Sequence, residues 1–156
     1  MAVATPIRPE VSVASPPRDM VLAYVLLRTF TGLDFFGHGY ARTFTGSYLP
    51  GFAASLQKSM AAAPLSPDLV LYTGYAIPIL ELIVGALLIL GLWTRSALVL
   101  GFLLMFLLMF GVTMKQDWNA ASQQLLYGLV LFVLLFLRAR HDLSWPAFFH
   151  IERPRF

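Results

Sequence analysis

The chain has 156 residues, of which 58% are hydrophobic and 12% are charged, and its formal net charge is +3. Soluble domains carry about a quarter of charged residues, so this composition excludes a soluble globular protein. The chain has no cysteine, which excludes disulfides, thiolate nucleophiles and iron–sulfur clusters. Its basic residues form no clustered basic face, so we expect no nucleic-acid partner.

Four segments are apolar enough to cross a bilayer, since a spanning helix needs about 20 such residues. Residues 1–19 are polar and proline-containing, and they are expected to form a flexible tail before a membrane domain over residues 20–138. The predicted spans are residues 20–40, 69–93, 96–114 and 121–137. Residues 139–156 mix arginine with aromatic residues, which is typical of a tail at the membrane interface.

The predicted fold class is therefore an all-α membrane protein, a bundle of four antiparallel transmembrane helices. The connection over residues 42–67 is long for a loop in a compact domain, and residues 52–63 within it could form a short helix at the membrane surface. The links at residues 94–95 and 115–119 are short, so the second, third and fourth spans should be neighbours.

The positions of the basic residues predict the orientation in the membrane. Four spans place both termini on one side, together with seven Lys or Arg residues, against three on the other side. The seven are Arg8, Arg18, Arg95, Arg138, Arg140, Arg153 and Arg155, and the three are Arg42, Lys58 and Lys115. The positive-inside rule then puts both termini on the cytoplasmic side of the membrane. We expect this membrane to be a bacterial cytoplasmic membrane, and the lipid bilayer to be the first partner of the chain.

Arg28 and Glu81 are charged residues within predicted spans, where a charge costs about 2.5–3.5 kcal/mol on insertion scales. At a rise of about 1.5 Å per residue both lie at a similar depth from the cytoplasmic side, which predicts an ion pair between the first two spans. Glycines on the same faces, such as Gly32 and Gly85, would let these helices approach closely. Such a pair either fixes packing or orients a ligand.

Asp34 and His38 are one helical turn apart and share a face of the first span. A carboxylate can hold one imidazole nitrogen and leave the other free to give or take a proton, so both are candidate catalytic residues for proton handling. Tyr75 and Tyr127 lie at neighbouring depths. The candidate ligand-binding residues are Arg28, Glu81, Tyr75 and Tyr127, and the alternative is an interfacial belt without a ligand.

The cofactor expected for such a site is a quinone or another small amphipathic ligand, because an apolar cleft with a few polar groups suits one. No metal site is expected. His38 is the one histidine within a predicted span, whereas a membrane haem usually takes two facing histidines, and Asp34, His38 and Glu81 differ in depth.

Short motifs in the first two spans resemble the DoxX-like family of small four-helix membrane proteins. They are Leu27-Arg28, Gly32 and the run over residues 35–39, then Pro78, Glu81, Gly85, the run over residues 88–91 and Thr94-Arg95. The resemblance covers about residues 24–137 and implies a four-helix bundle. The family includes the DoxD subunit of thiosulfate:quinone oxidoreductase, so it also implies membrane quinone chemistry or an accessory role. Where family members often carry Lys after the His-Gly pair, this chain has Arg42, which stays charged and suits proton transfer poorly.

Two functions are left open by the sequence, and with them whether the chain is an enzyme. The first is an accessory or structural subunit of a larger membrane complex, with redox or electron-transfer chemistry in other membrane-protein subunits. The second is a quinone-interacting oxidoreductase subunit of the DoxD type. A closed ion pair between packed glycines would favour the first, and a cavity that reaches His38 from the lipid would favour the second.

Overall fold

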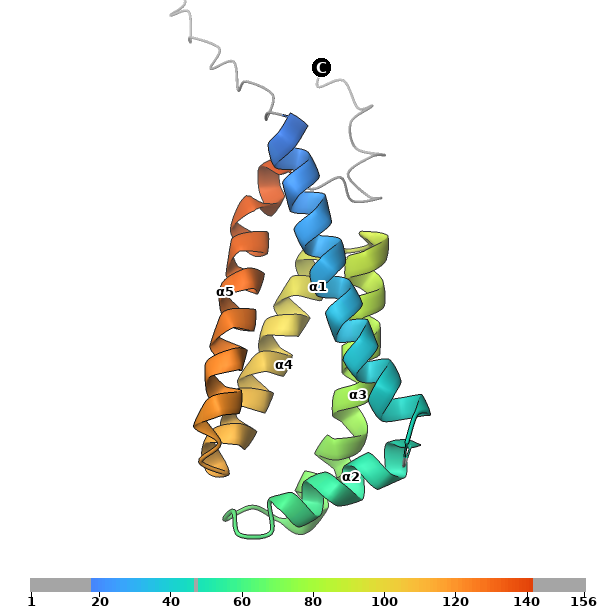
Figure 1. The fold of residues 1–156 in the computed structure, drawn as a ribbon, viewed down its shortest axis with the longest axis vertical. Coiled ribbons are helices and arrows are strands. Elements are labelled where there is room, and N and C mark those ends of the chain that lie inside the picture. The colour runs from blue at the N-terminus through green and yellow to red at the C-terminus, as the bar shows by residue number, and fades with distance from the viewer. Residues whose placement is uncertain (1–17, 47, 142–156) are drawn as a thin grey trace, which may run out of the picture.

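The computed structural model describes residues 18–46 and 48–141. In chain order the helices are α1 (Arg18–Phe44), α2 (Tyr48–Ser59), α3 (Pro67–Leu90), α4 (Thr94–Met114) and α5 (Trp118–His141). Helices α1, α3, α4 and α5 are long and apolar enough to cross a membrane, and α2 lies across one end of the bundle (Figure 1). The predicted fold class is confirmed, and the chain is an integral membrane protein.

The long helices extend beyond most of the predicted span boundaries. α3 is the exception and ends at Leu90, because Gly91 adopts a left-handed conformation with φ 68° and donates its N–H to the Leu87 carbonyl. Such a glycine is a common helix terminator. The predicted tails, residues 1–19 and 139–156, lie outside the described residues except where α1 and α5 run into them.

The short helix predicted over residues 52–63 is present as α2, although it begins and ends four residues earlier. Ala53 is fully buried and packs on α3, where a Cβ added to Gly74 would lie 2.7 Å from the Ala53 Cα. The backbones of α2 and α3 therefore touch, and this contact holds α2 across the end of the bundle. Its place at the membrane surface stays a prediction.

Helices α1 and α3 form the most closely packed pair in the bundle. A Cβ on Gly85 would lie 2.4 Å from the Phe36 nitrogen, and a Cβ on Gly39 would lie 2.7 Å from the Leu82 nitrogen. Real Cβ atoms do not approach a backbone so closely, so these positions require glycine. Small residues at such a seam let membrane helices gain van der Waals contact without a hydrophobic driving force.

Helix α1 packs less closely on α2 and α5 than on α3. The bundle therefore has a closed half and a more open half. Fully buried leucines near the α3–α4 turn, among them Leu88, Leu98 and Leu134, form a closed apolar core. Toward α2, the α4–α5 pair diverges from the α1–α3 pair (Figure 1). The titratable residues of the site described below lie in this more open half, whereas Arg28 is buried near the α3–α4 turn.

Replacing Gly85 with Ala should destabilise the protein by about 1–3 kcal/mol, because the added methyl group overpacks the α1–α3 seam. Gly37→Ala is the matched control on α1, since a Cβ there meets nothing within 4 Å and alanine is the better helix former. Thermal unfolding of both variants in detergent checks the prediction, and equal melting temperatures would contradict a seam at backbone contact.

Candidate functional site

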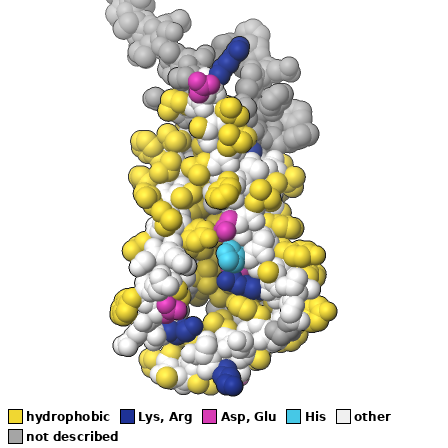
Figure 2. Space-filling model, in the orientation of Figure 1, with side chains coloured by type: hydrophobic (Ala, Val, Ile, Leu, Met, Phe, Trp, Pro, Cys, Tyr) yellow, Lys and Arg dark blue, Asp and Glu magenta, His cyan; other side chains and the backbone are white. Residues whose placement is uncertain are grey.

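Three polar residues of α1, namely Asp34, His38 and Arg42, follow one another at intervals of four and so lie along one face of the helix. All three line a cleft of about 340 Å³ in the open half of the bundle. Figure 2 shows acidic, histidine and basic side chains gathered on this face between apolar surfaces. The cleft, called here the polar cleft, also takes residues from each of the other four helices.

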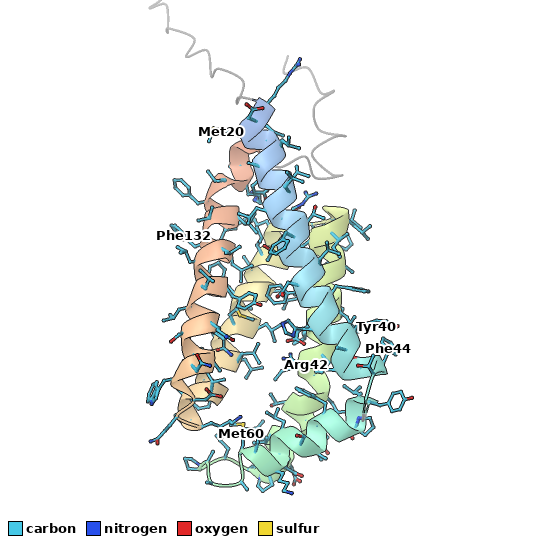
Figure 3. All side chains as sticks on the ribbon, in the orientation of Figure 1. Met20, Tyr40, Arg42, Phe44, Met60 and Phe132 are labelled. Carbon is cyan, nitrogen blue, oxygen red and sulfur yellow. The ribbon has the colours of Figure 1, made fainter. Side chains whose placement is uncertain are left out.

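Arg42 and Glu81 form an ion pair at the inner wall of the polar cleft. Arg42 Nη1 donates a hydrogen bond to Glu81 Oε1, and the side chain of Arg42 is directed from α1 toward the interior (Figure 3). The Glu81 side chain is 4% exposed, and that of Arg42 is 30% exposed. The guanidinium also lies 5.1 Å from the centroid of the Phe52 ring on α2. One cation therefore joins α1, α2 and α3.

The predicted ion pair between Arg28 and Glu81 is wrong. Gly39 lies against Pro78 and Leu82, which puts Glu81 level with the last third of α1. Arg28 is buried at the opposite end of α3. The depth estimate assumed that both spans begin at the same level, whereas the first turns of α1 project beyond the α3–α4 turn (Figure 1).

The guanidinium of Arg28 lies against the glycine that ends α3. A Cβ on Gly91 would meet Arg28 Nη1 at 2.7 Å, so the absence of a side chain makes room for the cation. The carbonyl groups at a helix C-terminus carry partial negative charge and favour a cation. Arg28 therefore belongs to the α3–α4 turn, and it does not line the polar cleft.

Asp34 and His38 face each other as the spacing predicted, with Asp34 Oδ1 3.8 Å from His38 Nε2. The side chain of His38 is 50% exposed, so it is accessible to a ligand or to water. Tyr127 of α5 also lines the polar cleft, together with Asp34. Tyr75 does not line the cleft, because six residues, or about 1.7 helical turns, turn it away from the face that carries Glu81.

A second opening, called here the α1–α5 groove, has a volume of about 400 Å³ and lies between those two helices. Its lining residues are Leu27, Phe30, Thr31, Asp34, Gln123, Leu126, Tyr127 and Val130. Asp34, Gln123 and Tyr127 line both the groove and the polar cleft. The polar cleft and the groove are therefore adjacent cavities, with these three side chains at their common border.

Two acceptor atoms of cleft residues are buried without a hydrogen-bond partner among the described residues. They are Oε2 of Glu81 and Oε1 of Gln124. A buried polar atom without a partner costs about 1–3 kcal/mol, so such atoms usually meet water or a ligand. The site as a whole offers three carboxylates, one imidazole, one guanidinium and one ammonium group, which can bind a polar group and exchange a proton.

Arg42 was not predicted to be a site residue, although the sequence carried a signal for it. Arg42 follows His38 by four residues and Asp34 by eight, so all three share a helical face. We placed it instead in the loop beyond the first span, because the predicted span ended at residue 40. Helix α1 continues to Phe44 and carries Arg42 into the bundle.

The model of the family described as methylamine utilisation protein MauE matches residues 20–123, from the start of α1 into α5. No curated protein and no solved structure matches the chain. No DoxX model matches either, so the resemblance to that family is wrong. Several of its motif positions, such as Gly32, Gly85 and Gly91, meet needs of helix packing and turn geometry. They therefore do not distinguish one family of small bundles from another.

Replacing Arg42 with Met should lower stability by about 3 kcal/mol, because it leaves the Glu81 carboxylate buried without its cation. The double variant Arg42→Met/Glu81→Gln should recover much of that loss, since no charge is then left unpaired. Lys58→Met, which removes an exposed cation of α2, is the control. Unfolding in a detergent titration measures all three, and a double variant no better than the single one would disprove the coupling.

Proposed function

Since the chain belongs to the MauE family, we propose that it is a membrane component of a redox system of the methylamine-utilisation kind. In this proposal it is accessory to other membrane-protein subunits, and a partner carries the electrons. We place it in a bacterial cytoplasmic membrane, and the count of basic residues supports an orientation with both termini in the cytoplasm. In that orientation α2 and the adjoining end of the polar cleft face the outer side.

The chemistry of the polar cleft carries this proposal. Its charged and titratable groups include Asp34, His38, Arg42 and Glu81. Carboxylate, imidazole and guanidinium side chains are the types that bind polar ligands, and the first two also transfer protons. The chain has no cysteine, so it has no thiol chemistry with which to take up electrons itself. A subunit of this kind serves a redox reaction by holding a molecule or a proton while its partner changes oxidation state.

Extraction of the tagged chain from its native membrane in a mild detergent, followed by native mass spectrometry, tests the accessory role. We expect the chain to travel with polypeptides of an amine-oxidising or other redox system, at a fixed stoichiometry. An untagged extract treated in the same way is the control. A chain that runs alone and by itself oxidises an amine or reduces a quinone would contradict the proposal.

The α1–α5 groove favours a second, more specific function, that of a quinone-interacting oxidoreductase subunit. A quinone is lipid-soluble, and the groove lies between two spans, is lined by Asp34 and adjoins the polar cleft. The reduction of a quinone takes up protons as well as electrons. In this role Asp34 orients His38, His38 exchanges a proton with a ring oxygen, and a partner exchanges the electrons.

His38→Gln should lower the quinone-dependent activity of the assembled complex by about a hundredfold, which is the usual contribution of a general acid–base group. The amount of folded protein should not change, because the side chain of His38 is half-exposed. Tyr40→Phe is the control, since Tyr40 lies on the same helix and does not line the cleft. Activity assays at saturating quinone measure the effect, and unchanged activity would rule out this role for His38.

A further inference from the structure

A third cavity, called here the apolar pocket, lies between α2, α3 and α4 and has a volume of about 180 Å³. It borders the polar cleft at side chains such as Leu56 and Leu108, and none of its described lining residues belongs to α1 or α5. The one hydroxyl group of this lining, that of Thr73, donates to the carbonyl of Leu69. Apart from a single lysine, the side chains around the pocket therefore offer a ligand apolar contacts.

The apolar pocket lies at the lipid-facing surface of the bundle. Leu107 and Phe110 of its lining are 39% and 49% exposed, and both belong to the span α4. A Cβ built on Gly111, which also lines the pocket, would meet nothing within 4 Å, so there is room beside the α4 backbone. Water does not fill a cavity lined by hydrocarbon, whereas about 150 Å³ is enough for a small apolar molecule. Within a bilayer the molecule at hand is an acyl chain.

The direction of the pocket agrees with that of a lipid chain. Its lining residues on this side run from Leu107 to Lys115, a distance of about 12 Å along a helix. Lys115 directly follows the last residue of α4, so the charged end of the pocket lies at the end of the span and the apolar end lies toward its middle. A lipid of the leaflet on the α2 side also has its head at that surface and its chain toward the bilayer centre.

The basic residues at the α2 end of the bundle favour an anionic head group. Lys115 is the charged residue of the pocket lining, and it lines the polar cleft as well. Neither Lys115 nor Lys58 forms an ion pair within the described residues. Lys58 lies near the end of α2 and lines a depression that shares Met60 with the apolar pocket. Arg42, the third cation at this end, is held by Glu81. The cations left for a ligand here therefore flank the apolar pocket.

The acidic residues at the same end of the bundle do not neutralise these lysines. Asp117 accepts a hydrogen bond from the Ala120 N–H at the start of α5. Asp68 lies in the first turn of α3, where the helix dipole stabilises a negative charge. Each of these carboxylates thus serves a helix N-terminus, and the positive charge beside the apolar pocket is left for a ligand.

We propose that the apolar pocket is a binding site for one anionic phospholipid of the leaflet on the α2 side. One acyl chain occupies the pocket, and the head group faces Lys115 and Lys58. A zwitterionic lipid fits the same walls, but the cation of its own head group cancels the charge of its phosphate, so it gains less from the lysines. The site uses neither Asp34 nor His38, and its test therefore stands whether or not the chain serves a quinone.

Native mass spectrometry of the purified full-length chain in a mild detergent tests the proposal. The chain is titrated with dioleoylphosphatidylglycerol and, separately, with dioleoylphosphatidylcholine, which has the same acyl chains. We expect one molecule of the anionic lipid to bind about fivefold or more tightly than the zwitterionic lipid, which is the usual effect of a lysine near an anionic head group. Equal affinities, or anionic lipid that adds without saturating at one molecule, would overturn the proposal.

Two sets of variants separate the chain from the head group. Gly111→Leu fills the pocket and should weaken the binding of both lipids about fivefold or more. Gly128→Leu is its control, because a Cβ on Gly128 of α5 also meets nothing within 4 Å and Gly128 lines none of the three cavities. Lys58→Gln/Lys115→Gln should reduce the preference for the anionic lipid to about one and leave the binding of the zwitterionic lipid unchanged. Equal effects of the two leucines, or a preference that survives the double variant, would contradict the assignment.

Discussion

The pairing of Arg42 with Glu81 is the constraint on which the open half of the molecule depends. A buried carboxylate within a membrane span is costly unless a cation meets it, and the cation available here comes from the last turn of α1 and also lies over Phe52 of α2. One ion pair therefore determines how far α1 must run as a helix and where α2 can lie. The Arg42 side chain bonds to one carboxylate oxygen of Glu81, and the other oxygen is buried without a hydrogen-bond donor among the described residues.

Around this pair the bundle combines two kinds of packing. The α1–α3 seam is closed at backbone distance by glycines such as Gly39 and Gly85, and buried leucines form a closed apolar core near the α3–α4 turn. Between α1 and α5 the contact is loose enough to leave a groove. A closed seam and an accessible cavity were expected as alternatives, but the protein has both, on opposite sides of α1. Rigid packing on one side thus supports a polar site on the other.

Local patterns could be predicted from the sequence, whereas the relation between helices could not. Hydropathy located the four spans, and a spacing of four residues placed Asp34 beside His38. The mistaken Arg28–Glu81 pair came from register, because hydropathy alone does not reveal that the first turns of α1 pass beyond α3. Arg42 was missed because α1 continues past the apolar stretch. The DoxX resemblance failed because glycines that serve packing carry little information about family.

The α3–α4 turn has a mechanical consequence. Gly91 and Trp93 both adopt left-handed conformations there, with φ 68° and 43°, and the turn is the direct covalent link between the tightly joined α1–α3 pair and the α4–α5 pair. The angle between the two pairs at this turn therefore sets the width of the cavity at the far end of the bundle, where the α4–α5 pair diverges from the α1–α3 pair (Figure 1).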